Sequence, residues 1–145
     1  MWTDDTAVKT PILTTKYHNS YLTGGTWSPT RPGVFFTVKM DGTMDVWDLY
    51  YKHNEPTLTV QVSDQSLTTF AAHESGNTVT VGTADGSVTV LQLSAGLAEM
   101  APNEKLAINS MFDRETTREK NLEKAIKEAK VRSMAEMALG RRGTS

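Results

Sequence analysis

The fold is decided by residues 33–48, which have the sequence GVFFTVKMDGTMDVWD. Residues 34–40 are rich in β-branched and aromatic side chains, which favour strands. Residues 43–48 continue with a partial alternation of apolar and polar side chains. Between the two runs lies Asp41-Gly42, and glycine accepts the positive φ of a tight turn without a Cβ clash. The stretch therefore predicts a β-hairpin with its turn at Asp41-Gly42.

A second copy of this pattern lies downstream. Residues 78–93 have the sequence TVTVGTADGSVTVLQL, and their Asp85-Gly86 pair follows the first Asp-Gly pair by 44 residues. Upstream, Trp2 precedes Trp47 by 45 residues. A repeat of about 40–45 residues that carries Asp-Gly and then Trp-Asp is typical of WD-type β-propeller blades, which have four strands each.

We therefore predict an all-β chain of WD-type propeller blades (a partial propeller) followed by an α-helical tail. The expected boundaries are a partial blade at 1–24, blades at about 25–62 and 63–101, and a charged helical tail at 102–145. The partial blade should hold an outer strand, because residues 11–15 resemble residues 56–60. Since a ring needs about four to eight blades, we expect a C-terminal part of a longer propeller, or a ring completed by another chain.

The composition of the tail differs from that of the blades. Asn103 is a candidate N-cap, and residues 104–139 are rich in good helix formers. Leu122 and Ile126 lie on one face at helical spacing, but no apolar residue occurs between Phe112 and Leu122. That gap disfavours a continuous coiled coil and predicts a kink or an exposed crossing near residues 114–120.

The charge balance limits the classes of partner. The net charge is −2, with −5 on residues 1–101 and +3 on residues 102–145, so no strong overall field attracts nucleic acid. No apolar run approaches the ~18 residues of a membrane span. The chain has no cysteine, and its three histidines lack metal-ligand spacing. We expect no enzyme activity, no cofactor, no metal and no membrane contact, and we regard nucleic acid as a minor alternative.

Most candidate residues have a structural interpretation. The blade pattern comprises Trp27, Asp41, Gly42, Trp47, Asp48, Asp85 and Gly86. We interpret the Asp-Gly pairs as hairpin turns and the two tryptophans mainly as core. The Gly-His pair usual in such blades is missing, since neither His18 nor His73 follows a glycine. This absence disfavours the usual buried His–Asp–Trp network.

A smaller set of residues is predicted to contact partners. Arg31 and Lys39 face either a partner or solvent. In the tail, Met111, Phe112, Leu122 and Ile126 could pack on the propeller or on a neighbouring helix bundle. Alternatively, the basic residues of the tail could meet an acidic surface such as tubulin or nucleic acid, although glutamates are interleaved with them. A third interpretation is a solvated helix.

Two strings of the sequence resemble one family. The first is TWSPTRPGVFF at residues 26–36, and the second is MFDRET at residues 111–116. Together they resemble the C-terminal portion of axonemal outer-arm dynein intermediate chains, of the second-intermediate-chain type. The resemblance covers roughly residues 2–130, most of the chain.

The resemblance implies a non-catalytic scaffold of a ciliary motor. Such chains dock a propeller on the tail of a dynein heavy chain and pair with a second intermediate chain, in the cytoplasm and cytoskeleton at the axoneme of a cilium or flagellum. Light chains bind N-terminal extensions, so their binding is not assigned to these residues. The alternatives are a WD-repeat adaptor of another complex (cytoplasmic dynein or ciliary transport) and a tail that binds microtubules or nucleic acid.

Overall fold

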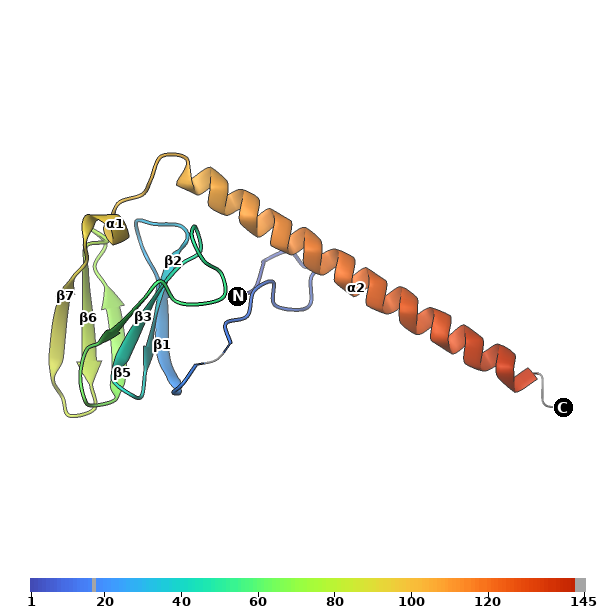
Figure 1. Ribbon diagram of the computed structural model, residues 1–145, viewed down its shortest axis with the longest axis horizontal. Coiled ribbons are helices and arrows are strands. Elements are labelled where there is room, and N and C mark those ends of the chain that lie inside the picture. Colours follow the sequence, from blue (N-terminus) through green and yellow to red (C-terminus); the bar gives the residue numbers. More distant parts are fainter. Residues whose placement is uncertain (17, 143–145) are drawn as a thin grey trace. The chain divides into compact units, whose positions relative to one another are not determined.

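The computed structural model describes residues 1–16 and 18–142. The chain divides into two compact units, one of residues 15–109 and one that joins residues 1–14 to residues 110–145. Figure 1 shows the elements in chain order. They are β1 (Leu22–Trp27), β2 (Val34–Lys39), β3 (Thr43–Asp48), β4 (Leu58–Gln61), β5 (Leu67–Ala72), β6 (Thr78–Thr83), β7 (Val88–Gln92), α1 (Ala95–Ala98) and α2 (Glu104–Arg142).

Two antiparallel sheets make up the first unit. One has four strands in the order β1-β2-β3-β4, and the other has three in the order β5-β6-β7. The predicted Asp-Gly turns connect β2 to β3 and β6 to β7. Each first strand also carries a register shift, between Leu22 and Gly24 in β1 and between Leu67 and Thr69 in β5. The repeat in the sequence is thus a repeat of strand order, turn and irregularity.

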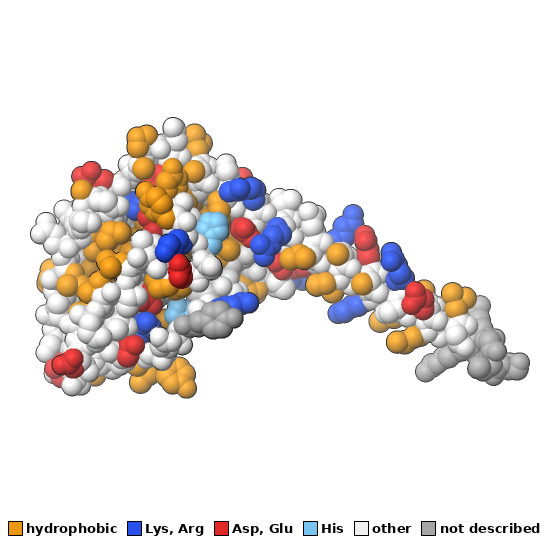
Figure 2. Space-filling view, in the orientation of Figure 1, with side chains coloured by type: hydrophobic (Ala, Val, Ile, Leu, Met, Phe, Trp, Pro, Cys, Tyr) orange, Lys and Arg blue, Asp and Glu red, His pale blue; other side chains and the backbone are white. Residues whose placement is uncertain are grey.

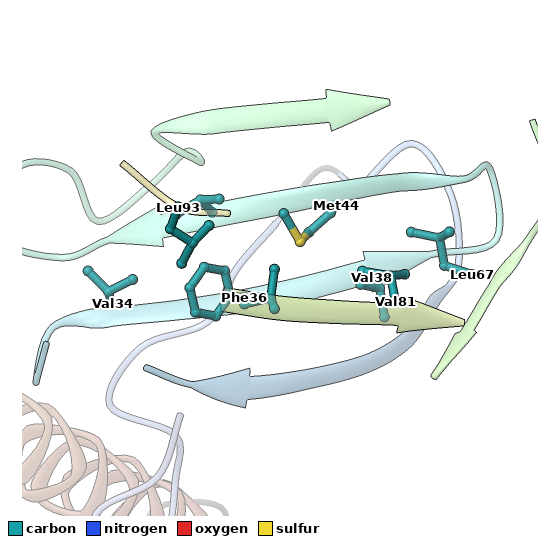
Figure 3. Packing of buried hydrophobic residues seen from close by; sticks show 9 residues of the cluster. Val34, Phe36, Val38, Met44, Leu67, Val81 and Leu93 are labelled. Atoms are coloured by element: carbon teal, nitrogen blue, oxygen red, sulfur yellow. The ribbon is translucent and has the colours of Figure 1, made fainter. Parts of the chain in front are cut away.

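The core lies between the two sheets (Figure 3). Alternate side chains of β2 and β3 point into it, and so do alternate side chains of β6, as the period of two in a strand requires. Its buried members are Val34, Phe36, Val38, Met44, Val46, Leu67, Val79, Val81 and Leu93. None of these residues has a polar side chain, so these side chains pack closely between the sheets without needing hydrogen-bond partners.

The segment before β1 differs from the expectation. No strand occurs in residues 1–16, so the predicted outer strand at residues 11–15 does not form. The Ile12 amide instead donates to the Met1 carbonyl at 3.0 Å, and the Met1 amino group donates to the Leu13 carbonyl at 2.8 Å. Residues 11–15 therefore resemble residues 56–60 in sequence but not in structure. Residues 58–61 form β4, which pairs with β3.

The tail is helical without interruption from Glu104 to Arg142. Of the two alternatives predicted near residues 114–120, a kink does not break the helix, and an exposed crossing stays a prediction. Five of the seven residues 114–120 are Arg, Glu or Lys, which are good helix formers, so an apolar stripe is not needed to keep the backbone helical. Asn103 precedes the helix with a φ of 61°, in the left-handed region rather than the extended region of an ordinary N-cap. Instead, the Glu104 carboxylate accepts the Ala101 amide at 2.8 Å.

Candidate functional site

The Asp-Gly pairs form side-chain-stabilised turns. Asp41 Oδ1 accepts the Thr43 amide at 3.0 Å and the Thr43 hydroxyl at 2.6 Å, while Gly42 has a φ of +82°. Asp85 accepts the hydroxyl of Thr83 and the Ser87 amide in the same way. The Thr43 hydroxyl, followed by its amide, lowers the pKa of Asp41. These carboxylates therefore serve the turns.

The two tryptophans of the blade pattern have different environments. Trp47 is 1% exposed, its Nε1 donates to Thr37 Oγ1 at 3.1 Å, and its ring stacks on Phe35 with 5.5 Å between centroids. Trp27 is 46% exposed, so it is only partly buried, and the prediction that it lies in the core is corrected. The physical reason is its position on β1, which lies at the edge of its sheet. The ring of His18 lies 5.8 Å from that of Trp47.

Lys39, predicted to face a partner or solvent, is buried. Its Nζ lies 3.0 Å from Asp45 Oδ2, and Asp45 Oδ1 accepts the Thr59 hydroxyl at 2.6 Å. Lys39 pairs within the chain because β2 and β3 place its side chain and that of Asp45 on the same face of the sheet. The prediction that Lys39 contacts a partner is therefore corrected.

Arg31 is also buried, with 3% of its surface exposed, and it lies between two carboxylates. Its Nη1 lies 2.8 Å from Asp48 Oδ2. Its Nη2 lies 2.6 Å from Glu104 Oε1, and its Nε donates to the same oxygen at 3.0 Å. Burial alone would lower the pKa of Arg31, but Glu104 and Asp48 outweigh burial and raise it. The guanidinium therefore stays charged inside the chain.

The residues around Arg31 form a socket for the first turns of α2. We define the helix socket as Thr30, Arg31, Gly33, Asp48 and the residues they hold, Gly96, Ala98, Glu104 and Ile108. The Thr30 hydroxyl donates to the Ala98 carbonyl at 2.6 Å, and Arg31 Nη1 donates to that of Gly96 at 2.8 Å.

Packing in the socket leaves no room for a side chain at Gly33. A Cβ atom there would lie 2.4 Å from Ile108 Cδ1. Because Ile108 is four residues after Glu104, both lie on the same face of α2, and both are buried. The socket thus fixes one face of the helix start to the loop that precedes β2.

Sequence reasoning missed Glu104 and the partner of Asp48. Glu104 was predicted only as a helix former, and Asp48 only as part of the Trp-Asp pair. One signal was available, since a carboxylate at the end of a predicted buried strand requires a cation or several donors. Arg31, in the loop before that hairpin, is the cation that the structure supplies.

The four tail residues predicted to bind a partner divide into two pairs. Met111 is buried and Phe112 is partly buried, whereas Leu122 and Ile126 are exposed. Figure 2 shows hydrophobic side chains at the surface of α2 between charged ones. Further exposed apolar residues of α2 are Leu106, Val131, Met134, Met137 and Leu139. Contact of these four residues with a partner stays a prediction.

The second sheet has an exposed face and a free edge. Val88 and Val90 are each 65% exposed, and they lie opposite Gly82 and Thr80 of β6. These four residues carry no charge. Within the described residues, no strand pairs with the outer edge of β7, whereas β4 covers the corresponding edge of β3.

The structure contains no arrangement typical of a metal or membrane site in its described part. Among residues 1–16 and 18–142, no three His, Asp or Glu side chains are placed to hold a metal ion. In the same residues no helix has the length and apolarity needed to cross a bilayer.

Comparison with known proteins gives a consistent family. The model of the dynein axonemal intermediate chain 3 WD40 domain matches residues 1–94. The flagellar outer-arm dynein 70 kDa intermediate chain of Chlamydomonas reinhardtii is 75% identical over 142 residues, covering 98% of this chain and 25% of its own length. The ciliary dynein intermediate chain 3 of Heliocidaris crassispina is 46% identical, covering 97% of this chain and 23% of its own.

Two further matches complete the comparison. Human dynein axonemal intermediate chain 2 is 42% identical, covering 91% of this chain and 22% of its own length. The chain thus spans about a quarter of the length of these relatives. Among solved structures, the WD40 domain of Toxoplasma gondii coronin matches with a TM-score of 0.52 at 22% identity, over 59% of this chain and 21% of that one. The WD-type fold class predicted from the repeat is confirmed.

Proposed function

We propose that the chain is a non-catalytic scaffold of an outer-arm dynein in the axoneme of a cilium or flagellum, since it belongs to the axonemal dynein intermediate chain family. Its blades dock on the tail of a dynein heavy chain, and it pairs with a second intermediate chain. Light chains bind other parts of the subunit. The carrying observation is the 75% identity to a flagellar outer-arm intermediate chain, which extends over 98% of this chain and therefore includes the tail as well as the blades.

The two sheets are proposed to be blades of a larger ring. The uncharged, exposed face of Val88 and Val90 is suited to pack against another sheet, as the opposite face of the same sheet packs against the first sheet here. The free edge of β7 supports the same proposal, because an unpaired edge is costly to leave in solvent. The division of the chain at residue 101 into blades and tail stays a prediction.

The tail helix is proposed to bind a partner through the part that follows its buried first turns. The helix socket buries Glu104 and Ile108, whereas Leu122 and Ile126 remain exposed farther along the helix. Such apolar residues, one turn apart on a helix, are a common anchor for a groove on a partner. The proposed partners of this face are the other subunits of the same motor.

The proposal is tested by affinity capture from a ciliary extract, with the subunit expressed together with the rest of its propeller. Capture is carried out at moderate and at high salt for the wild type, for Leu122→Glu with Ile126→Glu, and for Val131→Glu. Val131 is a matched control, since it is exposed and apolar but lies two and a half turns from Leu122, on the opposite side of the helix.

The wild type is expected to recover dynein heavy chain and a second intermediate chain at both salt concentrations. The double variant should lose one of them, and Val131→Glu should recover both. Recovery of tubulin or nucleic acid alone, lost at high salt, would overturn the proposal in favour of a basic tail, because charge-driven contacts weaken steeply with salt. Recovery of a non-axonemal complex instead would favour a WD-repeat adaptor.

A further inference from the structure

Two threonine or serine residues of the chain precede a proline. They are Thr10, before Pro11, and Ser28, before Pro29. Ser28 is buried, and its Oγ accepts the amides of Thr30 and Arg31 at 3.3 and 3.2 Å. Thr10 is exposed and lies in a segment without regular secondary structure. Of these two residues, Thr10 is therefore the one whose hydroxyl an enzyme can reach in the folded chain.

Thr10 lies against two glutamates of α2 within the unit of residues 1–14 and 110–145. Its hydroxyl contacts Glu119 Oε1 at 2.6 Å and Glu123 Oε1 at 3.0 Å. The Lys9 amide donates to the same Glu123 oxygen at 2.8 Å. Five residues before Thr10, Asp5 Oδ2 lies 2.5 Å from Lys120 Nζ. We call residues 5–10 the N-terminal strap.

Glu119 and Glu123 bind Thr10 as hydrogen-bond acceptors, so the contact requires a donor at Thr10. The Lys9 amide, followed by the Thr10 hydroxyl, lowers the pKa of Glu123, so this carboxylate is ionised at neutral pH. Glu119 and Glu123 are one helical turn apart and both point to the same hydroxyl. The site thus accepts a neutral hydroxyl and disfavours any anion in its place.

We propose that Thr10 is a phosphorylation site for a proline-directed protein kinase and that its phosphate releases the N-terminal strap from α2. The kinase transfers the γ-phosphoryl group of ATP to Thr10 Oγ1, forming a P–O bond as the bond to the leaving ADP breaks. The hydroxyl proton passes to the catalytic aspartate of the kinase. The site loses its donor and gains a charge of about −1.5 to −2.

Release follows from electrostatics at short range. The phosphate stands where the hydroxyl contacted Glu119 and Glu123, so two carboxylates face a dianion. A phosphate beside acidic side chains disrupts a contact by like-charge repulsion. Lys9 and Lys127 also act on Glu123 electrostatically, but no ion pair joins either of them to it among the described residues. Lys120 is paired with Asp5.

The test uses the full chain, ATP and a purified proline-directed kinase, with the phosphorylated residue located by mass spectrometry. Zero-length carbodiimide coupling of Asp5 to Lys120 then reports whether the strap is bound, because this reagent joins a carboxylate to an amine in direct contact. The yield of this cross-link is expected to fall about tenfold on phosphorylation. Amide exchange at Lys9, measured on the same samples, should accelerate by a similar factor.

Two variants separate charge from loss of the donor. Glu119→Gln with Glu123→Gln keeps an oxygen acceptor at each position without the charge, so phosphorylation should change its cross-link yield by less than about twofold. Thr10→Val removes the donor without adding charge and should give a smaller loss than the phosphate does. No phosphate on Thr10, equal labelling of Ser28 in the folded chain, or an unchanged cross-link yield after phosphorylation would each overturn the proposal.

Discussion

Arg31 and Glu104 form a buried ion pair across 73 residues of sequence, with 2.6 Å between Nη2 and Oε1. The pair joins the loop before β2 to the first residue of α2. Neither side chain is more than 3% exposed, so both depend on each other and on Asp48 for neutralisation. Removing one member of a buried pair leaves a charge uncompensated, which is far more costly than losing an exposed pair.

The variant Arg31→Met is accordingly expected to lower the free energy of unfolding by about 3–5 kcal/mol. The measurement is urea denaturation followed by tryptophan fluorescence. Lys52→Met is the matched control, because it breaks the exposed Lys52–Glu55 pair and should cost less than about 1 kcal/mol. Equal losses in the two variants would contradict a buried, mutually dependent pair.

The two tryptophans of the first blade provide a second prediction. Trp47→Ala should destabilise the chain by about 3–5 kcal/mol, because the ring is buried, stacked on Phe35 and bonded to Thr37. Trp27→Ala should cost clearly less, since nearly half of Trp27 is already exposed. Far-UV circular dichroism in urea is the suitable measurement, as it does not rely on the deleted ring. A change under about 1 kcal/mol for Trp47→Ala would rule out its core role.

Local sequence patterns predicted most of the fold. The Asp-Gly turns, the hairpins on either side of them and the helical tail all follow from residues within a few positions of each other, which is the range over which turn chemistry and periodicity act. The 44-residue repeat then indicated the class of fold, because blades are equivalent units. The same local logic failed at residues 11–15, which resemble a strand in sequence but form none in the structure.

The socket was not predictable in this way. Nothing near Arg31 in the sequence encodes Glu104, and a charged residue in a loop is more often on the surface than buried. Lys39 was misplaced for a related reason, since its partner Asp45 is visible only once the register of β2 and β3 is known. Pairings across strands and between distant segments belong to the tertiary structure, and local patterns in a single sequence do not reveal them.

Acid should weaken the Asp-Gly turns. The pKa of Asp41 is lowered by the Thr43 hydroxyl, and that of Asp85 by the Thr83 hydroxyl. A carboxylate with a depressed pKa in the folded chain contributes stability above its unfolded pKa of about 3.9. This contribution is lost as the pH falls through the lower, folded value. Unfolding free energy should therefore decline as the pH drops below about 4.5.

Urea denaturation across this range, with Asp41→Asn and Asp85→Asn combined, checks the assignment. Asparagine keeps the oxygen acceptor but does not titrate in this range, so the double variant should lose less stability on acidification. Between pH 6 and 8 the two proteins should show the same slope, because both aspartates are ionised in either state. Parallel curves at low pH as well would show that other carboxylates dominate the acid response.

The glycines of the two turns offer the sharpest contrast, because their backbones match and their surroundings differ. Gly42 has a φ of +82° and Gly86 a φ of +87°, so an alanine is strained at either position. A Cβ at Gly42 would also lie 1.8 Å from the Ser63 carbonyl oxygen, whereas nothing lies within 4 Å of one at Gly86. Gly86→Ala should cost about 1–2 kcal/mol of unfolding free energy, the cost of the left-handed backbone alone.

Gly42→Ala adds a backbone clash that no side-chain rotation can relieve. It should cost about 3 kcal/mol or more, measured by the same urea titration on both variants. The difference between the two isolates the contact of the first turn with the segment that follows β4, since the conformational strain is shared. If both variants lost the same stability, Ser63 would have to move freely, and the first turn would not be packed against that segment.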